Sequence, residues 1–337
     1  MIPHNRPTLG PDEQAAAARV IESGWVAQGS EVNAFENELC RFFNLPDGHA
    51  VAVSSGSAAL FLALWALNGK DKRVGIPVYS CSALRNAVGM IDGQSIYLDC
   101  EANSPNLDFV AVERAELDIL IAPSMFGLPV KLPLHRTYKL IEDLAQSIGA
   151  CVGNEKIGLR GELGICSFYA TKLMTTGGQG GAVISRDKAL IDLIRDYREF
   201  DCRNDRQFRF NFQMTDLQAA VGRVQLARLP SFIETREKWY SMYKLAGLSI
   251  LSDTSTEVQP VRYRIVMRTR HPNRVIEALN TAGIRAIVPI EECELLDGTT
   301  DYPAAVALAN SSVSLPAWPG LKEEDVLKIT RIAGEFA

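Results

Sequence analysis

Residues 140–150, LIEDLAQSIGA, and residues 164–185, GICSFYATKLMTTGGQGGAVIS, decide the fold of this chain. Apolar runs at 138–142, 164–169 and 182–185 predict three buried strands, because short apolar runs bounded by turn residues are typical of buried strands. Asp143 follows the first strand, and Lys172 follows the second, just before a glycine-rich turn. Ligands of α/β proteins bind at strand ends, so we expect both residues at a binding site.

Asp143 and Lys172 suit the chemistry of pyridoxal phosphate (PLP). An amine beside apolar strands is less readily protonated, and it can form a Schiff base with a carbonyl group. PLP is an electron sink only while its pyridine nitrogen is protonated, and a buried carboxylate maintains that state. The two residues alone leave another interpretation open, in which Lys172 is a surface lysine after a strand and Asp143 is a helix cap.

The same stretch resembles the signature of the DegT/DnrJ/EryC1/StrS family of PLP-dependent sugar aminotransferases, in the blocks IEDLAQSIGA and ICSFYATKLMTTGGQGGAVIS. The resemblance implies that Lys172 binds PLP covalently as a Schiff base and that Asp143 contacts the pyridine nitrogen. It also implies that Gln146 lies by the 3-hydroxyl group and that Ser167 binds the phosphate. The spacings Asp-x-x-Gln and Ser-x-x-x-x-Lys both match the family pattern.

A second block, SGSAAL at residues 55–60, follows an apolar strand predicted at 49–54 and begins a helix predicted to reach residue 67. A strand, a glycine turn and a helix start can form a phosphate cradle, although many such turns do not. By resemblance, Ser57 and Ala58 bind the cofactor phosphate. Cys81 stands where many family members stack an aromatic residue on PLP, and its small side chain covers less of the ring.

The alternating segment RQFRFNFQ at residues 206–213 has two interpretations. Its phenylalanines alternate with polar residues, which predicts a half-buried hairpin strand. The family resemblance implies a loop that reaches into the active site of a partner subunit. Gln213 then matches a position where relatives often carry Asn or Arg against the phosphate, although glutamine has no charge.

Composition limits the function classes. The 337 residues are 47% hydrophobic, enough for a large core divided between two lobes. The net charge of −5 and the lack of a basic run argue against nucleic-acid binding. Seven cysteines without a CxxC pair indicate reduced thiols and a cytoplasmic protein, and four scattered histidines predict no metal site. The most apolar window, 50–67, is interrupted by serines and a glycine, so we expect no membrane span.

Alternating strands and helices predict a mostly parallel sheet with helices on both faces. Further elements are expected as follows: strands at 73–78, 94–99 and 118–123; helices at 11–23, at 188–198 and from a cap at Ser30; a helix at 214–229 that ends near Pro230; and a second long helix from about residue 231. A smaller α+β lobe then follows, with strands at 258–268 and 284–288 and helices at 272–282 and 321–333. We expect no catalytic residue in this lobe.

The resemblance implies the PLP fold type I. It predicts a large PLP-binding α/β domain at residues 1–235, with an N-terminal arm at 1–10, and a small α+β domain at 236–337. It also implies a homodimer with a shared active site. The expected activity is transfer of an amino group from glutamate to a keto group of a nucleotide-linked sugar, in polysaccharide or secondary-metabolite biosynthesis.

Two alternatives stay open at this point. One is a sugar dehydratase-like relative, although those enzymes carry His at the lysine position and this chain has Lys172. The other is a PLP-binding regulatory protein or pseudo-enzyme, which the departures at Cys81 and Gln213 keep open. Similar folds carry out different chemistries.

Overall fold

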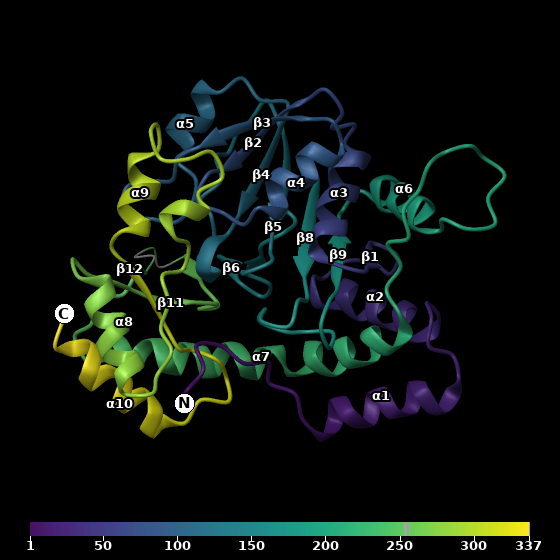
Figure 1. Ribbon diagram of the computed structural model, residues 1–337. Helices are drawn as coiled ribbons and strands as arrows, with labels where there is room; N and C mark the ends of the chain where they lie inside the picture. Colours follow the sequence, from purple (N-terminus) through teal and green to yellow (C-terminus); the bar gives the residue numbers. More distant parts are fainter. Residues whose placement is uncertain (253–254, 256, 337) are drawn as a thin grey trace.

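The computed structural model describes residues 1–252, 255 and 257–336, and its centre is a seven-stranded sheet (Figure 1). In spatial order the strands are β1 (Ala50–Val53), β9 (Gly181–Ile184), β8 (Leu163–Ser167), β5 (Lys139–Asp143), β4 (Ile119–Pro123), β2 (Arg73–Pro77) and β3 (Gln94–Leu98). Neighbours are parallel from β8 to β3, whereas β9 is antiparallel to both β8 and β1. The predicted mostly parallel sheet is confirmed.

Helices cover both faces of this sheet. The helices α3 (Gly56–Ala66), α4 (Ala83–Met90) and α6 (Lys188–Arg198) pack on one face, and α2 (Ser30–Phe42) and α7 (Asp216–Leu245) pack on the other. Strand β1 has contacts on both sides, since Val51 and Val53 face the first set of helices and its two alanines face the second. Two more helices complete the layers: α1 (Pro11–Ser23) lies along α7, and α5 (Phe109–Arg114) packs near β3 (Figure 1).

One continuous helix, α7, links the sheet to the C-terminal part of the chain (Figure 1). The predicted break at Pro230 is therefore wrong. An interior proline removes a backbone hydrogen bond and costs about 3 kcal/mol. The burial of Leu229 and Phe232 on either side offsets that cost. The expected domain boundary between residues 235 and 236 falls inside α7, and it stays a prediction.

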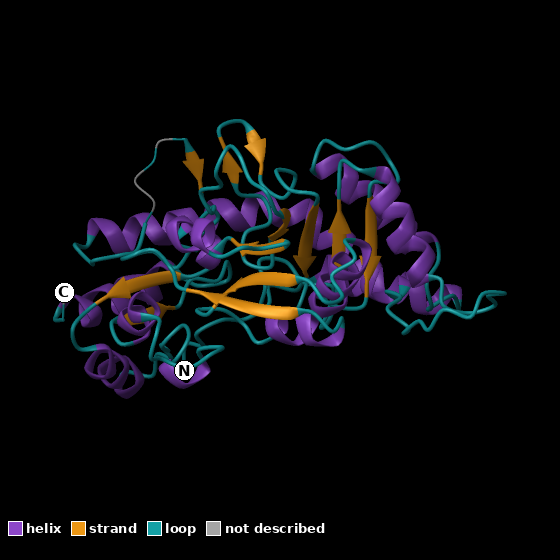
Figure 2. Ribbon diagram, turned by 90° about the horizontal axis from the view of Figure 1, so that it is seen from above, coloured by secondary structure: helices purple, strands orange, loops and turns teal. Residues whose placement is uncertain are grey.

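The C-terminal part has its own hydrophobic cluster, which includes the last turns of α7. Its remaining elements are β11 (Ile265–Arg268) paired with β12 (Ser312–Leu315), α8 (Pro272–Thr281) and α10 (Glu323–Gly334). By contrast, α9 (Pro303–Ala309) joins the cluster of the large sheet. A small sheet of β6 (Cys151–Val152), β7 (Glu155–Lys156) and β10 (Val258–Gln259) lies at the top of Figure 2.

Two strands predicted in this part differ from the structure. The strand expected at 258–268 is divided into β10 and β11, which belong to different sheets, because Arg262 between them has φ of 48° and breaks the extended backbone. The strand expected at 284–288 makes only isolated bridges, from Ile284 to Ile2 and from Ile287 to Ser314.

Two further local predictions are corrected. Residues 206–213 form no strand but belong to a loop that extends from the body after α6 (Figure 1), with Phe208 96% and Phe210 58% exposed. Among the described residues, only the end of the segment meets a strand: Gln213 forms one bridge with Val53 of β1, and the Phe212 carbonyl accepts the Ser54 amide at 2.8 Å. A single bridge does not make a ladder, and a strand without a ladder is unstable. Ser30 is the first residue of α2 rather than its cap. The Asp216 carboxylate, distant in sequence, accepts the amides of Gly29 and Val32 at 2.8 and 3.0 Å.

Candidate active site

A pocket of about 540 Å³ opens at the carboxyl ends of the parallel strands. Its walls come from segments that follow β2, β4, β5 and β8 and from the C-terminal part of the chain. Three of the predicted site residues line it: Cys81, Gln146 and Lys172. Four segments far apart in sequence thus meet where open α/β sheets bind ligands.

Asp143 is the last residue of β5 and is buried. Its Oδ1 accepts the amide of Ala145 at 2.8 Å. Burial raises the pKa of this carboxyl, against the smaller opposing effects of the Ala145 hydrogen bond and the positive charge of Lys172. No lysine, arginine or histidine of the described residues forms an ion pair with Asp143. A cationic ligand group would therefore be stabilised here.

Lys172 lies in the turn after β8, half-buried in the pocket wall. Its backbone N–H donates to the Tyr169 carbonyl at 2.9 Å. Its Nζ lies 5.5 Å from the centre of the Tyr263 ring, an aromatic wall for the cation. The preceding carbonyl, of Thr171, accepts a hydrogen bond from the Asn5 side chain at 2.8 Å, so the N-terminal arm helps to hold this turn.

Gln146 connects the end of β5 to the loop after β4. Its Oε1 accepts the amide of Phe126 at 2.8 Å. Phe126 has φ of 59°, which is uncommon for a bulky residue, so this contact helps to stabilise a strained backbone. Gly127 follows with φ of 84°, and an added Cβ would lie 2.7 Å from the backbone nitrogen of Tyr263. The loop is thereby pressed against the segment that carries Tyr263.

The start of α3 forms a second polar region with the end of β8. A Cβ on Gly56 would lie 2.7 Å from Cβ and 2.9 Å from Oγ of Ser167, so only glycine permits this approach. Ser55 caps the helix by accepting the amide of Ala58 at 3.1 Å, and Ser57 is exposed. The Ser167 hydroxyl beside the backbone N–H groups at the start of α3 fits a phosphate group. This phosphate site and the carboxylate of Asp143 together fit the two ends of PLP.

Gln213, which was expected to contact a partner subunit, makes its contacts in the structure with residues of the same chain, near the end of β1. It forms a bridge with Val53, and its Nε2 donates to Glu199 Oε2 at 3.2 Å. Neither this residue nor the serines of the α3 start are among those lining the main pocket. Its expected contact with a partner subunit stays a prediction.

Comparison with known proteins decides the family. The model of the DegT/DnrJ/EryC1/StrS aminotransferase family matches residues 7–333. The chain belongs to this family. GDP-perosamine synthase of Vibrio cholerae is 27% identical, with 98% of this chain and 97% of that protein covered. The dTDP-3-amino-3,4,6-trideoxy-alpha-D-glucose transaminase of Streptomyces venezuelae is 28% identical, with 98% and 93% covered.

Among solved structures, DesV of Streptomyces venezuelae superposes with a TM-score of 0.88 at 27% identity, over 96% of this chain and 93% of that chain. The predicted family, fold class and enzyme class, a PLP-dependent aminotransferase, are therefore confirmed. The family supports PLP as the cofactor. Among the described helices, none combines the length and apolar character needed to cross a bilayer.

The C-terminal part contributes eight of the residues that line the pocket, and the sequence patterns predicted none of them; two of the eight, Tyr263 and Arg264, lie close to Lys172. Burial alone would raise the pKa of Tyr263, but the positive charges of Lys172, Arg264 and Arg236 outweigh it and lower this pKa. The residues precede an apolar strand in the run VRYR, and two arginines beside a buried strand were the available signal. Tyr263 and Arg264 come close to Lys172 only because the C-terminal part packs against the ends of the sheet strands.

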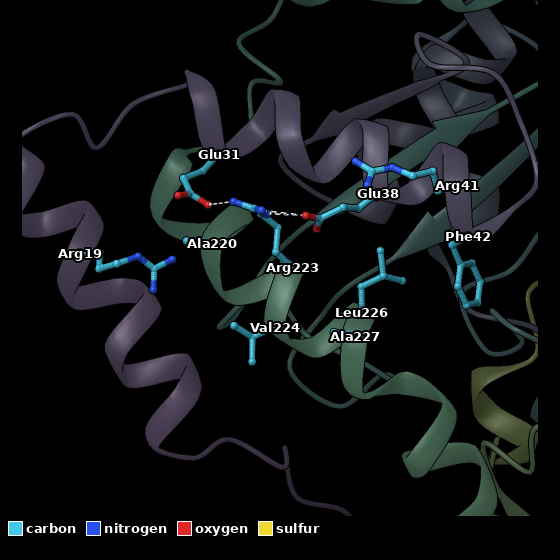
Figure 3. Close-up of a pocket in the computed structure, with 10 residues that line it drawn as sticks. All are labelled: Arg19, Glu31, Glu38, Arg41, Phe42, Ala220, Arg223, Val224, Leu226 and Ala227. Atoms are coloured by element: carbon cyan, nitrogen blue, oxygen red, sulfur yellow. Dashed lines mark hydrogen bonds and ion pairs between the residues drawn. The ribbon is translucent and has the colours of Figure 1, made fainter.

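A different pocket, of about 420 Å³, lies between α1, α2 and α7 (Figure 3). Its central cation, Arg223, is paired with Glu31 at 2.7 Å and Glu38 at 2.8 Å. None of the predicted site residues lines it. Both carboxylates of this pocket, Glu31 and Glu38, are already paired with Arg223, so we assign it no part in the reaction.

Proposed function

We propose that this chain transfers an amino group from an amino acid, glutamate, to the keto group of a nucleotide-linked sugar, with PLP as its cofactor. One observation carries the proposal: Asp143, a buried carboxylate with no ion pair among the described residues, ends β5, and Lys172 lines the pocket at the same edge of the sheet. In a member of this aminotransferase family, Lys172 would bind PLP and Asp143 would keep its ring nitrogen protonated.

The residues that would hold PLP divide by the group they contact. Lys172 would bind it covalently through Nζ, and Asp143 would bind the pyridine nitrogen. The other contacts would come from Gln146 at the 3-hydroxyl, Cys81 against the ring, Ser57, Ala58 and Ser167 at the phosphate, and Gln213 at the phosphate across a dimer. The close approach of Gly56 to Ser167 supports the phosphate end of this arrangement.

When bound, PLP supplies an electron sink for the α-carbon of the amino donor. The chain supplies the proton transfers and the charge. Once the amine of the donor has replaced Lys172 on the cofactor, the freed Nζ would take the proton from the donor α-carbon as a general base and later return a proton as a general acid. Asp143 would stabilise positive charge at the ring nitrogen, and its burial would strengthen that attraction because the interior screens charge weakly.

The names of the relatives support a nucleotide-linked sugar as the acceptor. They include a GDP-perosamine synthase, a dTDP-linked amino sugar transaminase and a UDP-N-acetyl-3-dehydro-alpha-D-glucosamine 3-aminotransferase. These differ in both nucleotide and sugar. The acceptor is therefore to be sought among GDP-, dTDP- and UDP-linked keto-sugars, with mass spectrometry of the aminated product as the assay.

The first test is covalent loading of PLP. Protein mixed with PLP is reduced with borohydride, digested and analysed by mass spectrometry. We expect the cofactor on Lys172, no such adduct in Lys172→Ala, and a normal adduct in Lys188→Ala, which removes an exposed lysine of α6. Full transaminase turnover by Lys172→Ala would overturn the assignment.

Adding glutamate to the loaded protein separates the alternatives. A transaminase loses the visible absorbance of bound PLP when glutamate is added and regains it with a keto-sugar. A regulatory PLP-binding protein or pseudo-enzyme keeps the band. A dehydratase-like relative would release no amino-sugar product.

We also propose that the protein is a homodimer with a shared active site. The exposed Phe208 and Phe210 of the loop after α6 support this, because large apolar side chains in solvent often mark an interface. Light scattering of the purified protein should give twice the chain mass of 37.0 kDa. A mass of 37.0 kDa at the working concentration would contradict it.

A further inference from the structure

Arg264 projects into the strand-end pocket from the C-terminal part of the chain. It directly precedes β11, and its backbone N–H donates to the Phe126 carbonyl at 3.3 Å. The amide of Phe126 is in turn bound by Gln146. One run of hydrogen bonds thus ties Arg264 to the polar end of β5, which also carries Asp143.

Among the described residues, the guanidinium of Arg264 has uncharged hydrogen-bond partners only. Its Nη1 lies 3.4 Å from Ser314 Oγ and 3.5 Å from His4 Nε2. Burial and the neighbouring arginines lower the pKa of His4 to about 3, so this ring is neutral at neutral pH. Within the described ranges, no carboxylate forms an ion pair with Arg264. Glu294 also lines the pocket, but it accepts the amide of Glu291 instead.

A second arginine adds to the positive charge behind this wall. Arg236 is fully buried, and its Nη1 donates to the carbonyls of Tyr263 and Ala317 at 3.0 and 2.9 Å. Burial lowers its pKa to about 10, which leaves it charged at neutral pH. Two cations that have no carboxylate partner among the described residues therefore lie next to each other, and Arg264 is the one of the two that lines the pocket. Such a wall favours an anionic ligand.

The position of Arg264 relative to Lys172 indicates which anionic group Arg264 would bind. Arg264 Cζ and Lys172 Nζ each lie 5.5 Å from the centre of the same ring, that of Tyr263. An α-amino acid carries its amine and its carboxylate on a single carbon. A donor whose amine replaces that of Lys172 therefore holds its carboxylate near the lysine. The phosphates of a sugar nucleotide lie further from the reacting carbon, beyond the sugar ring.

We propose that Arg264 binds the α-carboxylate of the amino-acid donor and thereby selects amino acids over simple amines. The planar guanidinium fork matches a carboxylate and can donate two parallel hydrogen bonds to it. The inference rests on the proposed aminotransferase function. It deepens that function by assigning donor recognition to a residue of the C-terminal part.

The test measures donor binding on the PLP-loaded protein. The donor is whichever of glutamate, glutamine, aspartate and alanine removes the visible band of the wild-type protein fastest. We expect Arg264→Gln to raise the half-saturating donor concentration about 10- to 100-fold, the range for a lost hydrogen bond to a charged group. Arg264→Lys should recover part of the loss, since it keeps the charge without the fork.

A direct binding measurement supplies a readout that does not depend on turnover. Calorimetry with 2-oxoglutarate should show a loss of affinity in Arg264→Gln of the same size. 4-Aminobutyrate, which is glutamate without its α-carboxylate, should react equally slowly with both proteins. Arg331→Gln, on the exposed side of α10, removes the same charge far from the pocket and should behave as wild type.

The outcomes are distinguishable from a failure of the proposed function. Covalent PLP on Lys172 in all variants, with unchanged donor dependence in Arg264→Gln, overturns this proposal alone. A variant that loses affinity for GDP, dTDP or UDP but not for 2-oxoglutarate also overturns it, in favour of nucleotide phosphate binding. A wild-type protein that forms no adduct with PLP, or reacts with none of the four amino acids, overturns both.

Discussion

Acid should weaken this protein through His4, a residue of the N-terminal arm. His4 Nε2 lies 2.9 Å from Ser314 Oγ, and Arg264 is close by. Burial, followed by the positive charges of Arg264, Arg285 and Arg236, lowers its pKa from 6.5 to about 3. Protonation is thus disfavoured in the folded state and normal in the unfolded chain.

The sign and size of the effect follow from linkage. Above the unfolded pKa both states carry a neutral ring, so His4 has no effect on pH dependence there. As pH falls from 6.5 towards 3, only the unfolded state binds the proton, and the free energy of unfolding falls by up to about 1.4 kcal/mol per pH unit. At about pH 5 the loss in the free energy of unfolding would be about 2 kcal/mol. Partial exposure of the His4 ring reduces this loss to between about 1 and 2 kcal/mol, because solvent screens the charge.

The assay compares wild type with His4→Gln, whose amide can still bond to Ser314. Free energies of unfolding from denaturant titrations are measured at about pH 7.5 and about pH 5. The change between the two pH values should be smaller in His4→Gln by about 1 to 2 kcal/mol. All other titrating groups are common to both proteins and cancel in this double difference. An equal loss of stability in both proteins would refute the reasoning.

Three further predictions concern single contacts. Gly56→Ala should weaken PLP binding about tenfold or more, because the new Cβ would lie 2.7 Å from Ser167 Cβ; unchanged affinity in an absorbance titration would contradict it. PLP should protect exposed Cys81 from iodoacetamide, as measured by peptide mass spectrometry, while Cys202 in the loop after α6 is labelled equally with or without PLP. Asp216→Ala should lower the free energy of unfolding by about 1 to 2 kcal/mol through loss of the α2 cap, with Asp216→Asn closer to wild type.

Local pattern was sufficient where one segment contains both the element and its functional residue. The strands β5 and β8 are short apolar runs, and the chain itself places Asp143 and Lys172 within a few residues of their ends. Parallel pairing of β5 with β8 then brings those ends to one edge of the sheet. The expected α1 and α6 also match, because their polar and apolar residues repeat with the helical period.

Local pattern failed where a distant residue decided the outcome. Pro230 predicts a helix end, yet burial of neighbouring side chains on both sides keeps α7 continuous. Alternation at 206–213 predicts a strand, but within the described chain only its last residue, Gln213, meets a strand, in a single bridge to Val53 of β1. Ser30 has the side chain of a cap, whereas the carboxylate that caps α2 belongs to Asp216.

The sequence by itself determined the strand-end acid and lysine, the alternation of strands and helices in the large sheet, and the family that these motifs indicate. Only the tertiary structure brought Tyr263 and Arg264 to Lys172, and the N-terminal His4 and Asn5 behind them. The physical reason is the range of the interactions. Period and turn chemistry act over a few residues, whereas contacts between residues as far apart in the chain as Lys172 and Tyr263 exist only once the whole chain is packed.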